Sequence, residues 1–254
     1  MIKRILKTIG LVLLLLIVLI IGGASWIIGT ETGFQQALAL GKKFAPGELE
    51  WEEASGKLSG PLNVRGLHFA QTDGIEIQLG DLDFDWRPSA LFGAELAVDQ
   101  LHLDGVEIHL AEAAEQPEED ATSSGELPDI SLPVSVNLDD IAITDIAIYP
   151  VGQEEAIQID RVALSASAEE SDIRLAKFEV LAPQGELHID GDVTVRDDYP
   201  MDLSLNWLAD IGQSSPVQGE GTLTGSLASL QLDHQISGFA EADIAATVTD
   251  VTQS

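Results

Sequence analysis

Residues 101–110 read LHLDGVEIHL, and this stretch contains the pattern that decides the fold. Apolar and polar residues alternate on both sides of Asp104-Gly105, which is the period of a β-strand with one buried face. The step between the two alternating runs is three residues instead of two. It predicts either a bulge inside one continuous strand or a two-residue hairpin turn at Asp104-Gly105.

The same pattern occurs twice more, as LNVRGLHF at residues 62–69 and as IAITDIAIYP at residues 141–150. The corresponding steps are Arg65-Gly66 and Thr144-Asp145. A type I′ turn needs positive φ at both central residues, which the β-branched Thr144 disfavours. We therefore expect a bulged continuous strand, which would also bend the sheet around its apolar face.

Apolar and polar residues alternate with a period of two from residue 48 onward. The sequence also contains a second repeat with a longer period. Four apolar residues at 77, 79, 82 and 84 match apolar residues at 157, 159, 162 and 164, which is 80 positions later. Two nested periods, near 40 and near 80 residues, predict a repeat architecture built from strands.

The composition excludes several classes of function. The 254 residues have a net charge of −31 and only 12 Lys and Arg, so the chain lacks the cations that phosphate binding requires. Cysteine is absent, which removes disulfides, thiol nucleophiles and thiolate metal sites. We expect no nucleic-acid partner.

The N-terminus predicts a membrane anchor. Ile9–Ile28 is a run of 20 residues without a charge, and a helix of that length spans about 30 Å of hydrocarbon. Positive charge before the run places the N-terminus in the cytoplasm and the rest of the chain in the periplasm. The topology charges are Lys3, Arg4 and Lys7, and the anchor residues are Leu11, Leu14, Ile17, Ile20 and Trp26. The alternative is a signal peptide cleaved near Gly22-Gly23-Ala24.

We divide the chain into five segments. Residues 1–29 form the cytoplasmic tip and the anchor, and residues 30–47 form a short juxtamembrane helix capped by Thr30 or Thr32. Residues 48–110 are a first β-segment and residues 130–254 a second. Between them, residues 111–129 are acidic, contain no basic residue, and are expected to be a disordered insertion.

No motif indicates catalysis, a metal site or a cofactor. The histidines at 68, 102, 109, 188 and 234 form no metal-binding motif, and most occupy polar positions of the alternating pattern. Asp81, Asp83 and Asp85 lack the glycine of a calcium loop and are expected to form a solvated acidic face. The glycines of GEGTLTG at residues 219–225 lack the lysine of a phosphate-binding loop. We expect no enzyme.

The apolar side of these strands must be covered. Two sheets could pack face to face in a sandwich, but the low aromatic content and uneven turn spacing favour one long sheet curled into a trough that takes a ligand. The fold expected is all-β, an elongated curled antiparallel sheet behind one transmembrane helix and one short amphipathic helix. The residues expected to line the trough are Leu67, Phe69, Ile77, Leu79, Leu82, Phe84, Leu101, Leu103, Val106, Ile108, Leu110, Ile141, Ile143, Ile146, Ile148, Ile157 and Ile159.

An ordered series of segments resembles a known family. It consists of the charged start and single span, GTETG–helix–APG, GKLSGPLNVRGLHF, LDFDWRPSALFGAELAVDQLHLDGVEIHL, the acidic insertion and LPVSVNLDDIAITDIAIYP. Together they resemble the N-terminal part of the TamB family, the AsmA-like, repeating β-groove subunits of the translocation and assembly module in the inner membrane of Gram-negative bacteria. The resemblance covers most of residues 1–189.

This resemblance implies a function in outer-membrane biogenesis. It implies a periplasmic groove that carries phospholipid from the inner towards the outer membrane and takes part in outer-membrane protein assembly with a TamA-like barrel partner. Family members are longer, so the barrel-binding region is expected to lie outside this chain, which is either a fragment or a short relative. The alternative is a non-enzymatic scaffold whose sheet edges pair with client β-strands.

Overall fold

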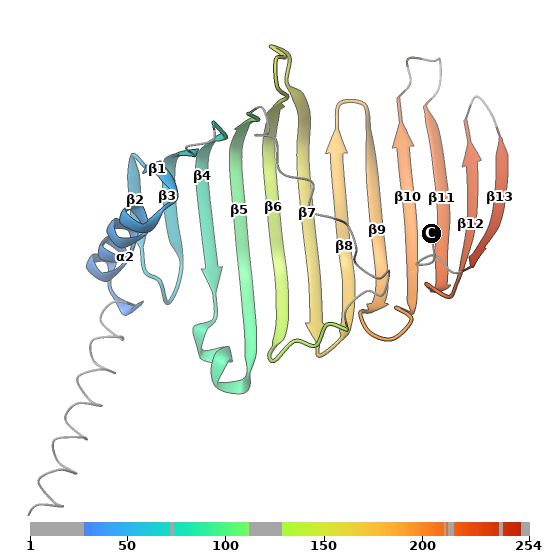
Figure 1. Ribbon diagram of the computed structural model, residues 1–254, viewed down its shortest axis with the longest axis horizontal. Coiled ribbons are helices and arrows are strands. Elements are labelled where there is room, and N and C mark those ends of the chain that lie inside the picture. The colour runs from blue at the N-terminus through green and yellow to red at the C-terminus, as the bar shows by residue number, and fades with distance from the viewer. Residues whose placement is uncertain are drawn as a thin grey trace, which may run out of the picture.

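The computed structural model describes residues 28–71, 74–111, 129–210, 212, 216–238 and 241–249. They form a sheet of 13 strands with helix α2 at one edge (Figure 1). The expected membrane span and most of the expected acidic insertion, residues 9–27 and 112–128, lie outside the described residues. No helix in the described part of the chain has the length and hydropathy that a membrane crossing requires.

The strands follow one another across the sheet almost in chain order, as β1-β3-β4 and onward to β13, and β2 pairs with β3 beside β1. Their bounds are β1 Gly47–Glu50, β2 Glu53–Gly56, β3 Leu62–Gln71, β4 Glu76–Trp86, β5 Glu95–His109, β6 Ser135–Tyr149, β7 Ile157–Glu169, β8 Asp172–Ala182, β9 Gly185–Thr194, β10 Met201–Ala209, β11 Val217–Ser226, β12 Ser229–Ser237 and β13 Ala242–Thr249.

One pair of strands corrects the expectation of an antiparallel sheet. β5 and β6 are parallel, in register from Glu95 opposite Ser135 to His109 opposite Tyr149, whereas all other neighbours are antiparallel. A parallel neighbour requires the chain to return to the starting end of the strand before it continues. The long connection between β5 and β6 makes this return.

The parallel pair explains the 40-residue repeat. Leu101 lies opposite Ile141 and Val106 lies opposite Ile146, so the two copies of the motif are direct neighbours in register. The copy at residues 62–69 lies at the same height on β3, two strands away, because Leu67 pairs with Leu79 and Leu79 pairs with Val106. The 80-residue repeat places matching residues of β4 and β7 in common rows.

The three-residue steps form a crease across β3 to β7. At the crease each strand has one residue that the Cα pairing skips, and these residues are Gly66, Gly80, Gly105, Asp145 and Asp160. φ is +58° at Gly66, +68° at Gly105 and +53° at Asp145. Since β5 runs unbroken through Gly105, the continuous strand is confirmed and the hairpin turn is wrong. The register is the same on both sides of the crease, so the step is a kink shared by neighbouring strands and the expected bulge is wrong.

Helix α2, Glu31–Phe44, confirms the expected short helix. The Thr30 side chain accepts a hydrogen bond of 3.0 Å from the Gly33 backbone N–H, which satisfies one free donor of the first turn. Phe34 is 2% exposed, and the Gln35 side chain donates to the Ala54 carbonyl of β2. The helix therefore covers the N-terminal edge of the sheet, which would otherwise be open to unwanted strand pairing.

The described residues form one layer of sheet and not a sandwich. The core cluster contains the buried residues Leu79, Val106 and Ile146, and it lies on a single face. No large side chain among the described residues is fully buried. The apolar side chains are therefore packed against their lateral neighbours, while the face itself has no second sheet over it.

Candidate functional site

The candidate site is the apolar face of the sheet, defined here as the face that carries Leu79, Val106 and Ile146. One row of this face runs through Leu67, Leu79, Val106, Ile146 and Ile159 on five successive strands, and each pairs with the next. The three-residue step at the crease keeps the residues before and after it on one side of the sheet. The side chains therefore form a connected apolar surface.

The structure brings the predicted lining residues together on this face. Parallel rows above and below the first contain Phe69, Ile77, Ile108, Ile148, Ile157, Leu82, Leu103, Ile143, Phe84, Leu101 and Ile141. Leu110 is different, since it lies one residue beyond the end of β5 and is 45% exposed.

The apolar face also includes residues that were not among the predicted lining set. It continues across β8 to β13 through Phe178, Val180, Leu187, Ile189, Leu203, Leu205, Trp207, Leu223, Leu232, Ile236, Ile244 and Val248. The same period-2 alternation marks these residues, so the sequence contained the signal. On β3 to β13, every strand residue of this face is apolar or glycine except Gln71, at the end of β3, and His234.

His234 forms the polar spot on the face with Trp207. The Trp207 indole donates to His234 Nε2 at 3.1 Å, and the two rings stack with centroids 6.0 Å apart. Both rings lie over β11, where Gly219 and Gly221 have no side chain. In LQLDHQI, His234 occupies a position of the alternating pattern that is otherwise apolar, and this was the sequence signal for a polar contact on the apolar face.

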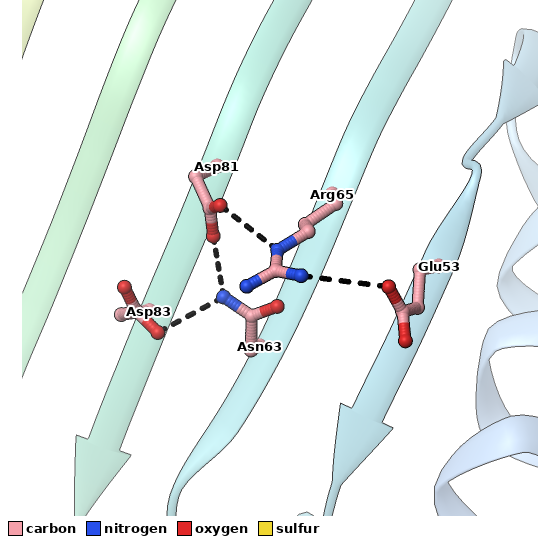
Figure 2. A network of polar contacts seen from close by, with 5 residues as sticks. All are labelled: Glu53, Asn63, Arg65, Asp81 and Asp83. Atoms are coloured by element: carbon pink, nitrogen blue, oxygen red, sulfur yellow. Dashed lines mark hydrogen bonds and ion pairs between the residues drawn. The ribbon is translucent and has the colours of Figure 1, made fainter.

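The opposite face is polar and carries the charge. Arg65 donates to Asp81 at 3.1 Å and pairs with Glu53 at 3.5 Å, while Asn63 donates to Asp81 and to Asp83 (Figure 2). These side chains come from β2, β3 and β4. The carboxylates of the expected acidic face are thus partly paired with a guanidinium and an amide on neighbouring strands.

Ion pairing changes the titration of three groups on the polar face. A hydrogen bond from His68 is the main cause that lowers the pKa of Glu76, with a second contribution from Gln78. Hydrogen bonds to Asp99 and Asp192 raise the pKa of Arg87 and of Arg174. All three groups are solvent-exposed, so these pairs contribute little to stability.

A hollow near one end of the sheet has a mixed lining, in which Val136, Ala168, Ile173 and Val193 lie beside polar side chains. It has a volume of about 560 Å³ and lies where β5 to β9 meet their connections at one end of the sheet. Its side chains include Glu95, Asn137, Glu169, Arg174 and Asp192. In the described part of the chain, no group of three or more His, Cys, Asp or Glu could hold a metal ion.

A family model described as TamB, N-terminal domain matches residues 19–150 and 125–253. The chain belongs to this family. The two matched ranges share residues 125–150, which contain β6, the strand that begins the second half of the sheet. Membership of the TamB N-terminal domain family fits a role in outer-membrane assembly by a non-enzymatic module. No match was found among curated proteins or among solved structures.

Proposed function

We propose that this chain is part of an inner-membrane-anchored conduit in the periplasm, which shields phospholipid acyl chains on its apolar sheet face. The lipid moves from the inner towards the outer membrane, and its supply contributes to the assembly of outer-membrane proteins. A TamA-like barrel is the proposed partner at the outer membrane, through regions outside this chain. Membership of the TamB N-terminal domain family supports this assignment.

The observation that carries the proposal is the absence of Asp, Glu, Lys and Arg from one largely apolar face. From β3 to β13, no strand residue on this face is Asp, Glu, Lys or Arg, although the chain contains 55 such residues. A packed core would need a second layer to exclude water, and the described residues supply none. Acyl chains are the matching cover, because each methylene removed from water contributes about 0.8 kcal/mol.

The arrangement of the edges supports a direction of travel. Helix α2 packs at the edge formed by β1 and β2, close to the proposed membrane anchor, and β13 forms the far edge (Figure 1). With about 4.8 Å between neighbouring strands, the face extends about 50 Å away from the anchored edge. Lipid that slides across the strands would therefore move away from the inner membrane.

The test is the lipid bound to the full chain purified in mild detergent. Ile108 lies on the apolar face and Glu107 on the polar face of the same strand, so they form a matched pair. We expect phospholipid, identified by mass spectrometry, with the unchanged chain and with Glu107→Lys, and a severalfold loss with Ile108→Glu. An unpaired carboxylate beneath an acyl chain is strongly unfavourable. Equal lipid in all three samples would contradict the proposal.

A second function, a scaffold for client β-strands, is supported by the edge strand β13. It pairs with β12 along Ala242–Thr249, and no strand in the described part of the chain pairs with its other side. Ile244 and Val248 on this strand are 43% and 52% exposed. A photo-crosslinker at the exposed Ala245 should capture client proteins if the scaffold operates, whereas one at the central Ala163, which is 4% exposed, should not.

A further inference from the structure

The connection between β4 and β5 ends in an exposed apolar tip. It contains the short helix η1, Pro88–Gly93, on which Phe92 is 97% exposed and Leu91 is 48% exposed. Among the other exposed large apolar side chains of the described residues, Phe44 at the end of α2 is 78% exposed and the rest, such as Leu110 and Val151, are close to half exposed. Such complete exposure of an aromatic ring is unfavourable in water unless something covers it.

The tip has a well-defined conformation. The Arg87 N–H donates to the Ala97 carbonyl at 2.9 Å, and the Ala94 N–H donates to the Leu91 carbonyl at 3.0 Å. The Arg87 side chain donates to Asp99 at 2.7 Å at the base of the hairpin. Phe92 is therefore held outward by a hydrogen-bonded support, and the β4–β5 connection projects beyond the neighbouring strand ends in Figure 1.

The start of the described chain lies at the same corner of the sheet. The Ser59 N–H donates to the Ile28 carbonyl at 2.9 Å, and the Trp86 indole donates to the Leu58 carbonyl at 2.7 Å. The β2–β3 turn thus connects Ile28 on one side with the base of the β4–β5 tip on the other. Ile28 is the last residue of the uncharged run that begins at Ile9. The described part of the chain begins with Ile28, at this corner of the sheet.

The charge of this corner suits a lipid surface. Residues 56–61 contain Lys57 and no Asp or Glu, in a chain whose net charge is −31. Residues 86–94 contain Arg87 and no Asp or Glu, and Arg87 is paired with Asp99 and Asp139 at the base of the tip. Basic residues close to a membrane are attracted to anionic headgroups, and aromatic side chains favour the interfacial region. Two side chains would be a small contact for a protein partner, which normally buries about 800 Å² on each side.

We propose that Leu91 and Phe92 insert into the periplasmic surface of the membrane that holds the N-terminus. This second contact, beside the anchor, fixes the tilt of the sheet and brings the β4–β5 end of the apolar face to the lipid. Trp86 and Val98 lie on that face directly above the tip and are paired with each other. Lipid would reach the apolar face there, so the inference rests on the proposed function and locates its point of uptake.

The absence of cysteine allows a direct test with single labels. Phe92→Cys is labelled with an environment-sensitive fluorophore in the full chain, reconstituted in liposomes that contain anionic phospholipid. The matched control is Val151→Cys, an exposed apolar position in the turn between β6 and β7 at the opposite end of the strands. We expect a blue shift and strong quenching by spin-labelled lipid at position 92, and neither at position 151.

The readouts separate the failure of this inference from the failure of the proposed function. A membrane-bound protein whose label at position 92 stays in water would overturn the inference, whatever the bound lipid. A shielded label that spin-labelled lipid does not quench would also overturn it, because protein would then cover the tip. Loss of co-purified lipid from the unchanged chain concerns the proposed function alone. A labelled Ser89→Cys chain on the same helix should give intermediate quenching if the tip inserts.

Discussion

Trp207 of β10 and His234 of β12 are joined across the strand that lies between them. The indole Nε1 donates to the imidazole Nε2 at 3.1 Å, and both rings lie over Gly219 and Gly221 of β11. A Cβ atom on Gly219 would lie 2.4 Å from the indole, and one on Gly221 would lie 2.3 Å from His234 Nδ1. The two glycines are therefore required for this contact.

We predict that Gly219→Val displaces both rings and lowers the free energy of unfolding by about 1–3 kcal/mol, the usual cost of overpacking. Denaturation of the detergent-solubilised protein would measure the loss, and near-ultraviolet circular dichroism would report the displaced indole. Gly60→Ala is the control, since a Cβ there would meet nothing within 4 Å. Equal stability of the two variants would show that the rings do not depend on Gly219.

At the crease, we predict different effects for two residues in the left-handed region. Gly105→Ala should cost about 1–2 kcal/mol of stability, because φ is +68° while the nearest atom to the added Cβ is 3.6 Å away. Asp145→Gly should change stability by less than about 1 kcal/mol, since Asp tolerates this region and glycine relieves its strain. Chemical denaturation measures both. A harmless Gly105→Ala would indicate that the crease relaxes.

For the centre of the apolar face, we predict that Ile146→Glu lowers stability by about 3–5 kcal/mol, as expected for an uncompensated buried charge. Ile146 is 6% exposed and packs in the core cluster. Ile146→Val should cost only about 0.5–1.5 kcal/mol. Thermal melting followed by far-ultraviolet circular dichroism compares the two, and similar melting points would mean that the acidic side chain reaches water.

The contact between His68 and Glu76 predicts a pH dependence. Because the pKa of Glu76 is lowered in the folded chain, its contribution to stability is present above the ordinary glutamate value and is lost as the pH falls through the lowered pKa. His68→Ala removes the largest cause and should move the Glu76 pKa back up. Carbon-13 titration of the Glu76 carboxyl measures this, with His188→Ala as the control. An unchanged value would contradict the assignment.

In helix α2, we predict that Gly41→Ala raises stability by up to about 1 kcal/mol. Gly41 is in an exposed helical position where a Cβ would meet nothing within 4 Å, so alanine lowers the entropy of the unfolded chain without a clash. A higher denaturation midpoint would be the result. A lower midpoint would indicate that the helix needs flexibility there.

Much of the fold followed from local patterns. Alternation predicted the strands and their apolar faces, Thr30 or Thr32 predicted the start of α2, and the disfavoured turn at Thr144 predicted a continuous strand. These features depend on a few neighbouring residues and on steric limits of the backbone. The residues of the apolar face were also predictable from local patterns. A three-residue step at the same position in neighbouring strands keeps their apolar side chains on one side of the sheet.

The parallel pair and the polar contact across β11 were not predicted. Alternation is the same in parallel and antiparallel strands, so it could not show that Leu101 would face Ile141 directly. The Trp207–His234 pair joins residues 27 positions apart and depends on the register of three strands. Pairing of distant residues is a property of the assembled sheet, which local patterns do not contain.

The parallel pairing of β5 with β6 divides the sheet into two parts, and this affects the order in which the parts fold. β3 to β5 and β6 to β13 are each a series of antiparallel neighbours joined by short connections, so each can form rapidly through local contacts. The β5–β6 pairing has a sequence separation of 40 residues and must close a longer loop, which is entropically more costly. We therefore expect the two meanders to form first and to dock afterwards along β5 and β6. Because the chain is synthesised from its N-terminus, β5 is made before β6. One edge of β5 therefore stays unpaired until β6 has been made.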